Sequence, residues 1–224
     1  MGGHGDGEYI EVHRQHLLYR VTHWGIVITG WIIGFTGLRL GGIWGVNIPS
    51  DYELALKIHV YTGLVFAFFW VLMFLQLITH EWKWFGFHRF PYSIKFLIAE
   101  SLAWLGLGPH VEDPRCYDPR KGDYREKIIP TEVTVPWAYI ALTLIMGLTG
   151  LPLYWPEYFH PIIAIANKYA PIFGLSNGVE LLRAVHRLVM FIYLMIMLIH
   201  AYACFVFGVV TSMITGKRKE RICK

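Results

Sequence analysis

The sequence predicts an all-α integral membrane protein, built as a four-transmembrane-helix bundle with an amphipathic interfacial helix in a long cytoplasmic loop. The chain of 224 residues is 55% hydrophobic and only 16% charged, whereas soluble domains average about a quarter charged residues. Four apolar runs are each long enough to cross a hydrocarbon core of about 30 Å. We expect a single membrane domain over residues 1–224, with spans at about 17–38, 55–78, 134–154 and 181–210 and the cytoplasmic loop at 79–132.

Composition also narrows the chemistry. The net charge of +4 gives no reason to expect a nucleic-acid partner. The three cysteines form neither CxxC nor CxxCH, which argues against an iron–sulfur cluster, a zinc site or covalently attached c-type haem in this chain. Residues 1–16 are polar and glycine-rich without an apolar core, so they are not a signal peptide, and we expect order there only where they meet a partner.

The first span carries His23 near its start. Gly30, Gly34 and Gly37 recur at three- and four-residue spacing along one face. Glycines on one face allow another helix or a flat ring to approach the backbone closely. Ordinary helix packing explains these glycines as well as a bound ring does.

The second span begins beside His59, and the loop that follows is longer than fifty residues. Loops of this length are usually functional. Its first half has amphipathic helical character and is too short and too charged to span, which predicts a helix lying on the membrane surface. Its second half is polar, basic and rich in turn residues.

The third span lacks histidine, and Gly147, Gly150 and Pro152 near its end favour a kink or an early stop. The fourth span holds two histidines, His186 and His200. Fourteen helical residues give roughly 21 Å of rise and leave the two rings within about 40° of one face. Ionisable side chains at membrane depth are costly and are first interpreted as functional groups.

Lysine and arginine predict the orientation. In this topology they gather in the N-terminal flank, the loop 79–132 and the C-terminal tail, and few remain on the opposite side. By the positive-inside rule both termini and the long loop are cytoplasmic. Four spans with both ends on one side are consistent with that assignment.

Depth then sorts the four membrane histidines into two pairs. His59 and His186 lie near the outer side, and His23 and His200 lie near the inner side. A b-type haem held by two histidines needs imidazoles that face each other from different helices at one depth. The pattern therefore predicts two stacked haems b, with these four histidines as the iron ligands. The other histidines lie in flanks and loops, and we interpret them as solvated or interfacial.

Cations lie within about one helical turn of these ligands. Arg20, Lys57, Arg183 and Arg187 are placed to pair with haem propionates or to act only as anchors at the membrane boundary. Arg183 is the best placed of them by sequence, and Arg20 is the second candidate that we carry forward.

Three motifs resemble those of a prokaryotic family of dihaem membrane cytochromes b. They are Arg20-x-x-His23-Trp24, Lys57-Ile58-His59, and the fourteen-residue spacing of His186 and His200. The resemblance covers nearly all of the chain, from Arg14 to the basic tail. The family includes the gamma subunit of membrane formate dehydrogenases and the b-type cytochrome subunit of nickel–iron hydrogenases, and the long loop slightly favours the former.

The resemblance implies a dihaem membrane-anchor subunit of a respiratory oxidoreductase complex in the prokaryotic cytoplasmic membrane. Its expected partners are an iron–sulfur subunit and a catalytic subunit on the outer face, and a menaquinone-like quinone that accepts electrons near the cytoplasm. In the formate dehydrogenase relatives the quinone pocket uses a Tyr-Asn-Ala-Gly-like stretch before the third span. The corresponding stretch here begins with Tyr117 and Asp118, with aspartate in place of asparagine and no glycine. The chain itself is then an electron-transfer subunit rather than the catalytic one.

Two other classes of function remain open from the residues alone. A histidine-containing transporter or proton channel would use the same histidines as a proton relay. Against it, acidic residues are absent from the interior of the spans and no internal repeat is evident. A haemless membrane anchor needs only the four helices and the loops.

Overall fold

The structure is a computed structural model that describes residues 8–223. Four long helices dominate it: α1 Leu17–Gly41, α2 Tyr52–Thr79, α5 Thr134–Tyr154 and α7 Gly178–Val206. All four are long and apolar enough to cross a membrane. The predicted class, an all-α integral membrane bundle, is confirmed.

The helix ends follow from local sequence. The last long helix, α7, stops at Val206, a few residues before the predicted end at residue 210. Gly208 adopts a left-handed conformation just beyond that point, with φ of 62°, and this conformation is incompatible with a continuing helix. Pro152 lies in the last turn of α5, which ends at Tyr154. Proline has no backbone N–H to donate to the carbonyl four residues earlier, which weakens the helix here and agrees with its end two residues later.

Shorter elements fill the connections. The helices are α3 Trp82–Phe85, α4 Phe90–Trp104, α6 His160–Tyr169 and α8 Val210–Thr215. The strands are β1 Tyr9–His13, β2 Cys116–Asp118, β3 Asp123–Glu126 and β4 Lys217–Arg221. Helix α4 occupies the amphipathic stretch of the long loop, as the sequence predicts. The strands and α6 were not anticipated.

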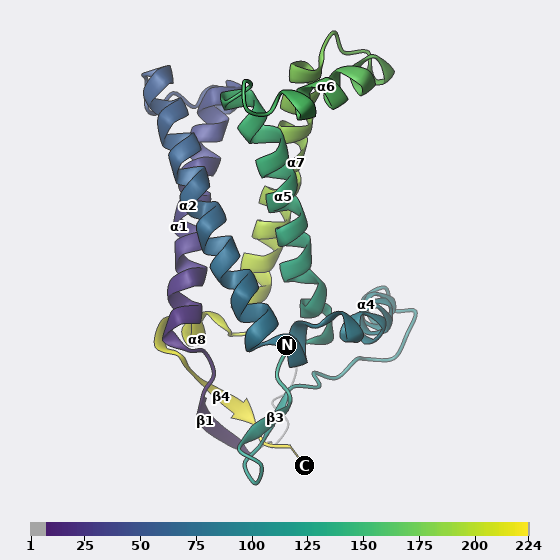
Figure 1. Ribbon diagram of the computed structural model, residues 1–224. Helices are drawn as coiled ribbons and strands as arrows, with labels where there is room; N and C mark the ends of the chain where they lie inside the picture. The colour runs from purple at the N-terminus through teal and green to yellow at the C-terminus, as the bar shows by residue number, and fades with distance from the viewer. Residues whose placement is uncertain (1–7, 224) are drawn as a thin grey trace. The chain divides into compact units, whose positions relative to one another are not determined.

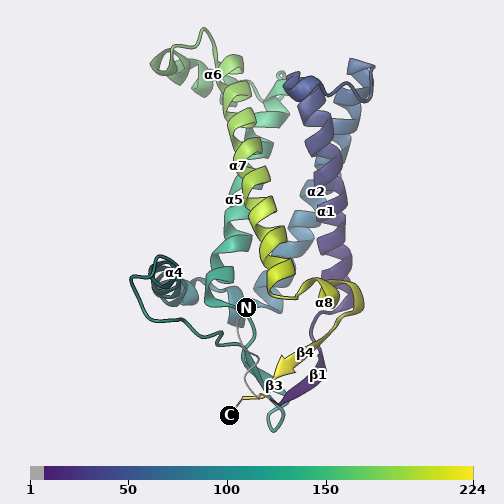
Figure 2. The ribbon, with the colours of Figure 1, turned by 180° about the vertical axis from the view of Figure 1, so that it is seen from behind.

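The chain divides into two compact units. The helical unit consists of Thr22–Leu72 and Tyr139–Val206, where the four long helices run side by side (Figures 1 and 2). The terminal unit consists of Met1–Val21, Met73–Ala138 and Phe207–Lys224, of which residues 8–21, 73–138 and 207–223 are described. Each unit is considered by itself below.

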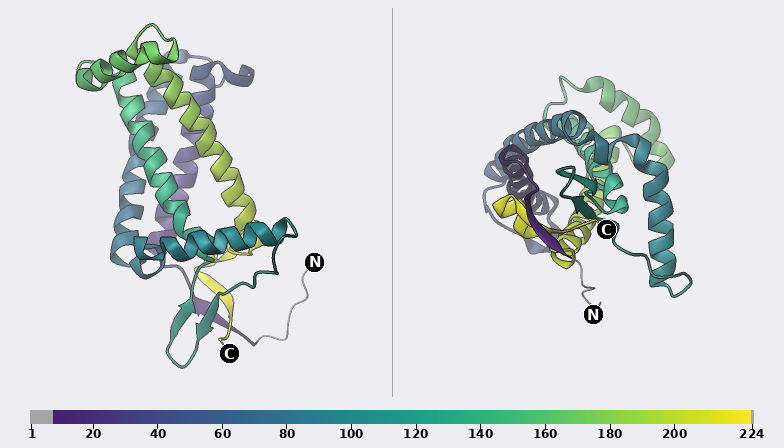
Figure 3. Two further views of the ribbon diagram at one scale, coloured as in Figure 1. Left: turned by 90° about the vertical axis from the view of Figure 1, so that its right-hand side faces the viewer. Right: turned by 90° about the horizontal axis from the view of Figure 1, so that it is seen from below.

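In the terminal unit the two ends of the chain pair with each other. Strand β1 runs antiparallel to β4, with Tyr9 opposite Arg221 and His13 opposite Lys217. The β2–β3 hairpin lies beside β4 (Figure 3). A disulfide between Cys116 and Cys223 closes this arrangement. The N-terminal flank from Glu8 is therefore ordered by the chain's own C-terminal tail, where we expected order only against a partner.

Buried ion pairs and a small apolar cluster hold the terminal unit together. Arg14 pairs with Glu220 at 2.5 Å, and Lys127 pairs with Glu81 at 2.6 Å, with all four side chains buried. Arg14 also donates to the Lys127 carbonyl. These contacts tie together four segments that are far apart in sequence, and removing one partner of such a pair would leave an uncompensated buried charge. The apolar cluster consists of Trp84, Ile128 and Val133.

Candidate functional site

The helical unit brings the four membrane histidines together as two pairs. His59 of α2 faces His186 of α7 with ring centroids 6.2 Å apart. His23 of α1 faces His200 of α7 with ring centroids 6.5 Å apart. Each pair joins two different helices, and α7 contributes one member to each. These are the pairs that depth along the helices predicts.

The spacing of each pair fits a haem iron between the rings. An imidazole nitrogen lies about 2 Å from a metal that it ligates and about 1 Å from the centre of its own ring, so two imidazoles on opposite sides of one iron have ring centres about 6 Å apart. Histidines in direct hydrogen-bonded contact would sit closer together. The residues present therefore suit two haems b, one at each pair.

The outer pair is supported by threonine hydroxyls. Thr36 Oγ1 lies 3.1 Å from His59 Nδ1, and Thr149 Oγ1 lies 2.9 Å from His186 Nδ1. The Ile33 carbonyl also lies 3.1 Å from His59 Nδ1. With Nδ1 engaged on both rings, Nε2 is the nitrogen that remains for a metal, as is usual for a ligand histidine with a partner on its other nitrogen.

Glycines let these two rings lie against neighbouring backbone. A Cβ at Gly37 would come within 3.3 Å of His59 Cε1, and a Cβ at Gly150 would come within 2.9 Å of His186 Cε1. Gly37 is one of the glycines whose spacing in the first span suggested close approach of a ring. The ring that it admits is the histidine itself.

The inner pair has different surroundings. His23 Nδ1 is buried and has no hydrogen-bond partner among the described residues. The Cys204 thiol lies 3.5 Å from His200 Nε2, one helical turn along α7. Rings of Trp24 and Tyr139 lie beside His23 and His200, with centroids 5.7 Å and 6.1 Å away. The groups beside the inner rings are thus aromatic rings and a thiol, where the outer rings have threonine hydroxyls.

Aromatic side chains fill the bundle between the two depths. Tyr193 lies on α7 seven residues from each of that helix's histidines, and its hydroxyl accepts a hydrogen bond from Trp70 Nε1 at 3.1 Å. Phe66 and Tyr139 pack on Tyr193 with centroids 6.0 Å and 5.0 Å away. These contacts place an aromatic cluster around Tyr193, midway along α7 between its two histidines.

The four candidate propionate cations have unequal surroundings. Arg20 donates to the Ile214 carbonyl through Nη1, but its Nε is buried without a partner. Arg183 and Arg187 are exposed. Lys57 is paired with Glu53 at 2.6 Å. A buried, partnerless Nε on Arg20, three residues before His23, leaves a donor available for a carboxylate.

The two quinone-pocket candidates lie in the β2–β3 hairpin of the terminal unit. Tyr117 lines a cavity of about 570 Å³, large enough for a small-molecule headgroup. Asp118 caps the hairpin turn by accepting a hydrogen bond from the Arg120 backbone N–H at 3.0 Å. Tyr117 therefore faces the cavity, whereas the structure assigns Asp118 a contact within the turn.

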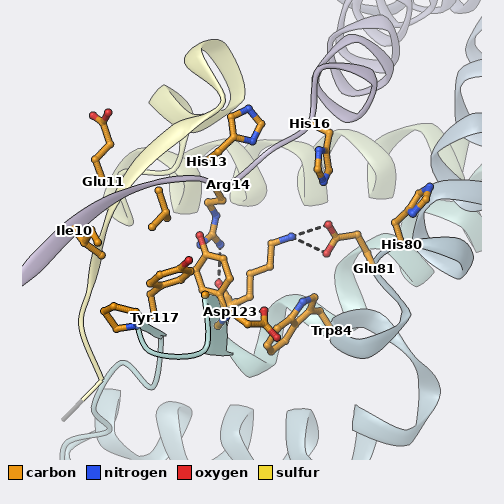
Figure 4. A pocket seen from close by; sticks show the side chains of 15 residues that line it. Ile10, Glu11, His13, Arg14, His16, His80, Glu81, Trp84, Tyr117 and Asp123 are labelled. Atoms are coloured by element: carbon orange, nitrogen blue, oxygen red, sulfur yellow. Dashed lines mark hydrogen bonds and ion pairs between the residues drawn. The ribbon is translucent and has the colours of Figure 1, made fainter.

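The cavity is polar and rich in titratable groups (Figure 4). His13, His16 and His80 line it together with the Lys127–Glu81 ion pair. Burial, reinforced by Glu220, raises the pKa of the lining residue Tyr124 to about 12, so its hydroxyl stays protonated at neutral pH. The sequence predicts these three histidines to be solvated or interfacial, and all three are exposed.

Comparison with known proteins identifies the family of the chain. A family model described as prokaryotic cytochrome b561 matches residues 14–216, which includes both histidine pairs and all four long helices. No curated protein matches the chain.

Proposed function

The chain belongs to the prokaryotic cytochrome b561 family, and on this premise we propose that it is a dihaem membrane-anchor subunit of a respiratory oxidoreductase complex. Membership in the family makes it a membrane cytochrome that binds haem b and transfers electrons. In the proposed role it passes electrons from an iron–sulfur partner subunit across the membrane to a quinone.

One observation carries the dihaem proposal: α7 presents two histidines on one face, and each meets a histidine of another helix at a ring-centroid distance near 6 Å. The fourteen-residue separation corresponds to roughly 21 Å along the helix. Two redox centres at that separation divide the path of an electron across a hydrocarbon core of about 30 Å into shorter steps. A single centre would not bridge that thickness.

The chain's own residues hold the cofactors. His59 and His186 would hold the outer haem, and His23 and His200 the inner one. Haem iron supplies the one-electron chemistry when bound, and the protein sets ligation and electrostatics. Tyr193, midway between His186 and His200 along α7, packs with Phe66 and Tyr139 in the helical unit. Arg183 and Arg20 stay the two candidates for propionate contacts, with Arg183 exposed and part of the Arg20 guanidinium buried.

We place the iron–sulfur and catalytic subunits at the outer pair and a menaquinone-like quinone at the cytoplasmic side. The lysine and arginine distribution supports cytoplasmic termini in a prokaryotic inner membrane. Tyr117, with Asp118 shaping its turn, supports a quinone headgroup site in the polar cavity, which His13, His16 and His80 also line. An electron that moves inward through a 100 mV potential exchanges about 2.3 kcal/mol with the membrane field.

A reduced-minus-oxidised spectrum of the purified full chain tests the proposal, with haem counted per chain as the pyridine haemochrome. We expect two b-type haems. One haem would show that one histidine pair is misassigned. No haem would overturn the proposal and favour the transporter, proton-channel or haemless-anchor alternatives.

The quinone site needs a separate measurement. In membranes that contain the chain, Tyr117→Phe is expected to slow reduction of the haems by a menaquinol analogue, because the hydroxyl that would bind the headgroup is lost. Tyr92→Phe is the matched control, since Tyr92 lies in the same unit on α4 and does not line the cavity. Equal rates for both variants would move the quinone away from this cavity.

A further inference from the structure

A short repeat links the two helices that flank the outer histidine pair. Residues 34–38 of α1 read Gly-Phe-Thr-Gly-Leu, and residues 147–151 of α5 read Gly-Leu-Thr-Gly-Leu. Each helix precedes the helix that carries one outer histidine. A repeat of five residues is too short to stand out in the sequence without the contacts that its residues make.

The first copy fixes the orientation of His59. The Thr36 hydroxyl donates to the Ile32 carbonyl at 2.8 Å, so its proton points away from the ring. Thr36 Oγ1 and the Ile33 carbonyl then both face Nδ1 as acceptors, each at 3.1 Å. Because a carbonyl only accepts, the ring proton belongs on Nδ1 and the lone pair on Nε2.

The second copy does the same for His186. The Thr149 hydroxyl donates to the Ile145 carbonyl at 2.7 Å, and its oxygen lies 2.9 Å from His186 Nδ1. The Met146 backbone also bonds this ring. Ile145 and Met146 precede Thr149 by four and three residues, as Ile32 and Ile33 precede Thr36, so the two copies have the same geometry.

The glycine after each threonine completes the platform. Gly37 and Gly150 leave room for the Cε1 edge of the ring that the preceding threonine orients. Each outer histidine thus lies on a Thr-Gly pair from a neighbouring helix, with the hydroxyl at one nitrogen and bare backbone under the adjacent carbon. Among residues 8–223, the inner pair has no equivalent: His23 Nδ1 is buried without a partner.

We propose that Thr36 and Thr149 are positioning residues for the outer haem. The two threonines fix the tautomer of His59 and His186 that ligates through Nε2, and they thereby hold the outer haem at a lower potential than the inner haem. The inference deepens the proposed dihaem function and rests on it. A hydrogen bond from Nδ1–H raises the basicity of the ligating imidazole. A more basic ligand favours the ferric state, which lowers the potential of that haem. The outer haem has two such bonds, whereas His23 of the inner pair has none. The outer haem therefore has the lower potential, which is the order of potentials that inward electron flow requires.

The test is a redox titration of the full chain that carries Thr36→Val, Thr149→Val or both. Valine keeps the shape of threonine and removes the hydroxyl. We expect the outer-haem potential to rise in each single variant and further in the double variant, with the inner-haem potential and the haem count unchanged. The outer haem is identified as the component that His59→Ala removes.

Thr29→Val is the matched control. Thr29 lies on α1 seven residues before Thr36, donates to the Gly25 carbonyl at 2.6 Å in the same way, and is 8% exposed against 5% for Thr36. No hydrogen bond joins it to a histidine among the described residues. We expect no change in either potential, while Thr36→Ser, which keeps the hydroxyl, retains the wild-type potential.

Unchanged potentials in Thr36→Val and Thr149→Val would overturn the inference, and so would an equal shift of both haems. If the double variant fails to fold, the single variants and Thr36→Ser still decide. Failure of the proposed function looks different, because the unmodified chain would then contain fewer than two haems.

Discussion

The outer and inner histidine pairs have nearly the same ring spacing but contrasting environments. Each ring of the outer pair has a threonine at Nδ1 and a glycine under Cε1. At the inner pair, His23 Nδ1 has no partner among the described residues, and the Cys204 thiol lies beside His200 Nε2. The positions of the histidines along their helices are thus enough to bring two rings to a haem-ligating distance. The orientation of each ring, in contrast, is fixed by hydrogen-bonding residues on other helices.

The difference reflects how the two pairs are built from the chain. The outer ligands occupy matching places in two helix pairs, α1 with α2 and α5 with α7. When the helix pairs are aligned on Thr36 and Thr149 and on the outer histidines, His23 corresponds to Pro136 and His200 corresponds to Met73. Only one copy of each inner position is a histidine. The outer pair is therefore symmetric and the inner pair is not, so each can be altered separately.

Removing one ligand from each pair gives the largest expected effect. His59→Ala and His200→Ala should each lower the pyridine haemochrome count from two haems per chain to one, because an iron left with one axial imidazole loses half its protein ligation. The remaining spectrum should differ between the variants, and His200→Ala should also abolish quinone reduction. A variant that keeps both haem signals would break the assignment of the pairs.

Filling the glycine positions tests how closely the outer rings are held. Gly150→Ala places a Cβ 2.9 Å from His186 Cε1, so the ring or the helix must shift, whereas Gly37→Ala places one 3.3 Å from His59 Cε1. Overpacking costs about 1–3 kcal/mol, which corresponds to roughly a 5- to 150-fold loss of haem affinity. We expect that loss at the outer haem for Gly150→Ala and a smaller one for Gly37→Ala.

The inner haem is the internal control in the same samples, and haem retained during dilution provides the measurement. Equal losses in the two variants would show that the rings are not held against these glycines. Loss of the inner haem as well would point to a general defect in the bundle.

Changing the sulfur group at the inner pair should have a smaller effect. Cys204→Ala removes the thiol that lies 3.5 Å from His200 Nε2 while leaving the ring on α7. We expect both haems to be retained and a small change in the electron paramagnetic resonance g values of the ferric inner haem alone, since a group beside a ligand tunes the metal without holding it. A change at the outer haem would contradict the separation of the two environments.

The sequence predicted the features that can be worked out for each helix separately. The four spans follow from hydropathy, and the two pairs follow from depth along each helix, which the structure matches by bringing His59 beside His186 and His23 beside His200. Their roles as haem ligands stay a prediction. The depth of a residue in the membrane does not give the rotation of its helix about the helix axis, however. The contacts of Thr36 and Thr149 with histidines on other helices therefore could not be predicted.

The terminal unit was harder to predict for a related reason. Pairing of β1 with β4 and of Cys116 with Cys223 joins segments that are far apart in sequence, 107 residues apart for the disulfide. Strand β1 alternates over only five residues, with Ile10 and Val12 on its less exposed face, and β4 contains no apolar residue at all, so the pair lacks the longer apolar alternation that identifies a strand. The cysteines show no motif spacing, so only the folded chain reveals that they meet.

The orientation of the chain decides whether the names outer and inner are right, and the disulfide offers a way to test it. The lysine and arginine distribution predicts that Cys116 and Cys223 face the cytoplasm, where thiols are kept reduced, whereas the structure joins the two in a disulfide. We therefore expect two thiols in cells and a disulfide in oxidised, purified protein. A membrane-impermeant maleimide should label both cysteines in inverted vesicles and neither in intact spheroplasts, and Cys223→Ser should reduce the labelling to Cys116 alone. Haem content should be unaffected, since both cysteines lie outside the helical unit.

Labelling of spheroplasts would reverse the orientation. The threonine-supported pair would then face the cytoplasm, and the low-potential end of the proposed electron path would lie beside the quinone in place of the iron–sulfur partner.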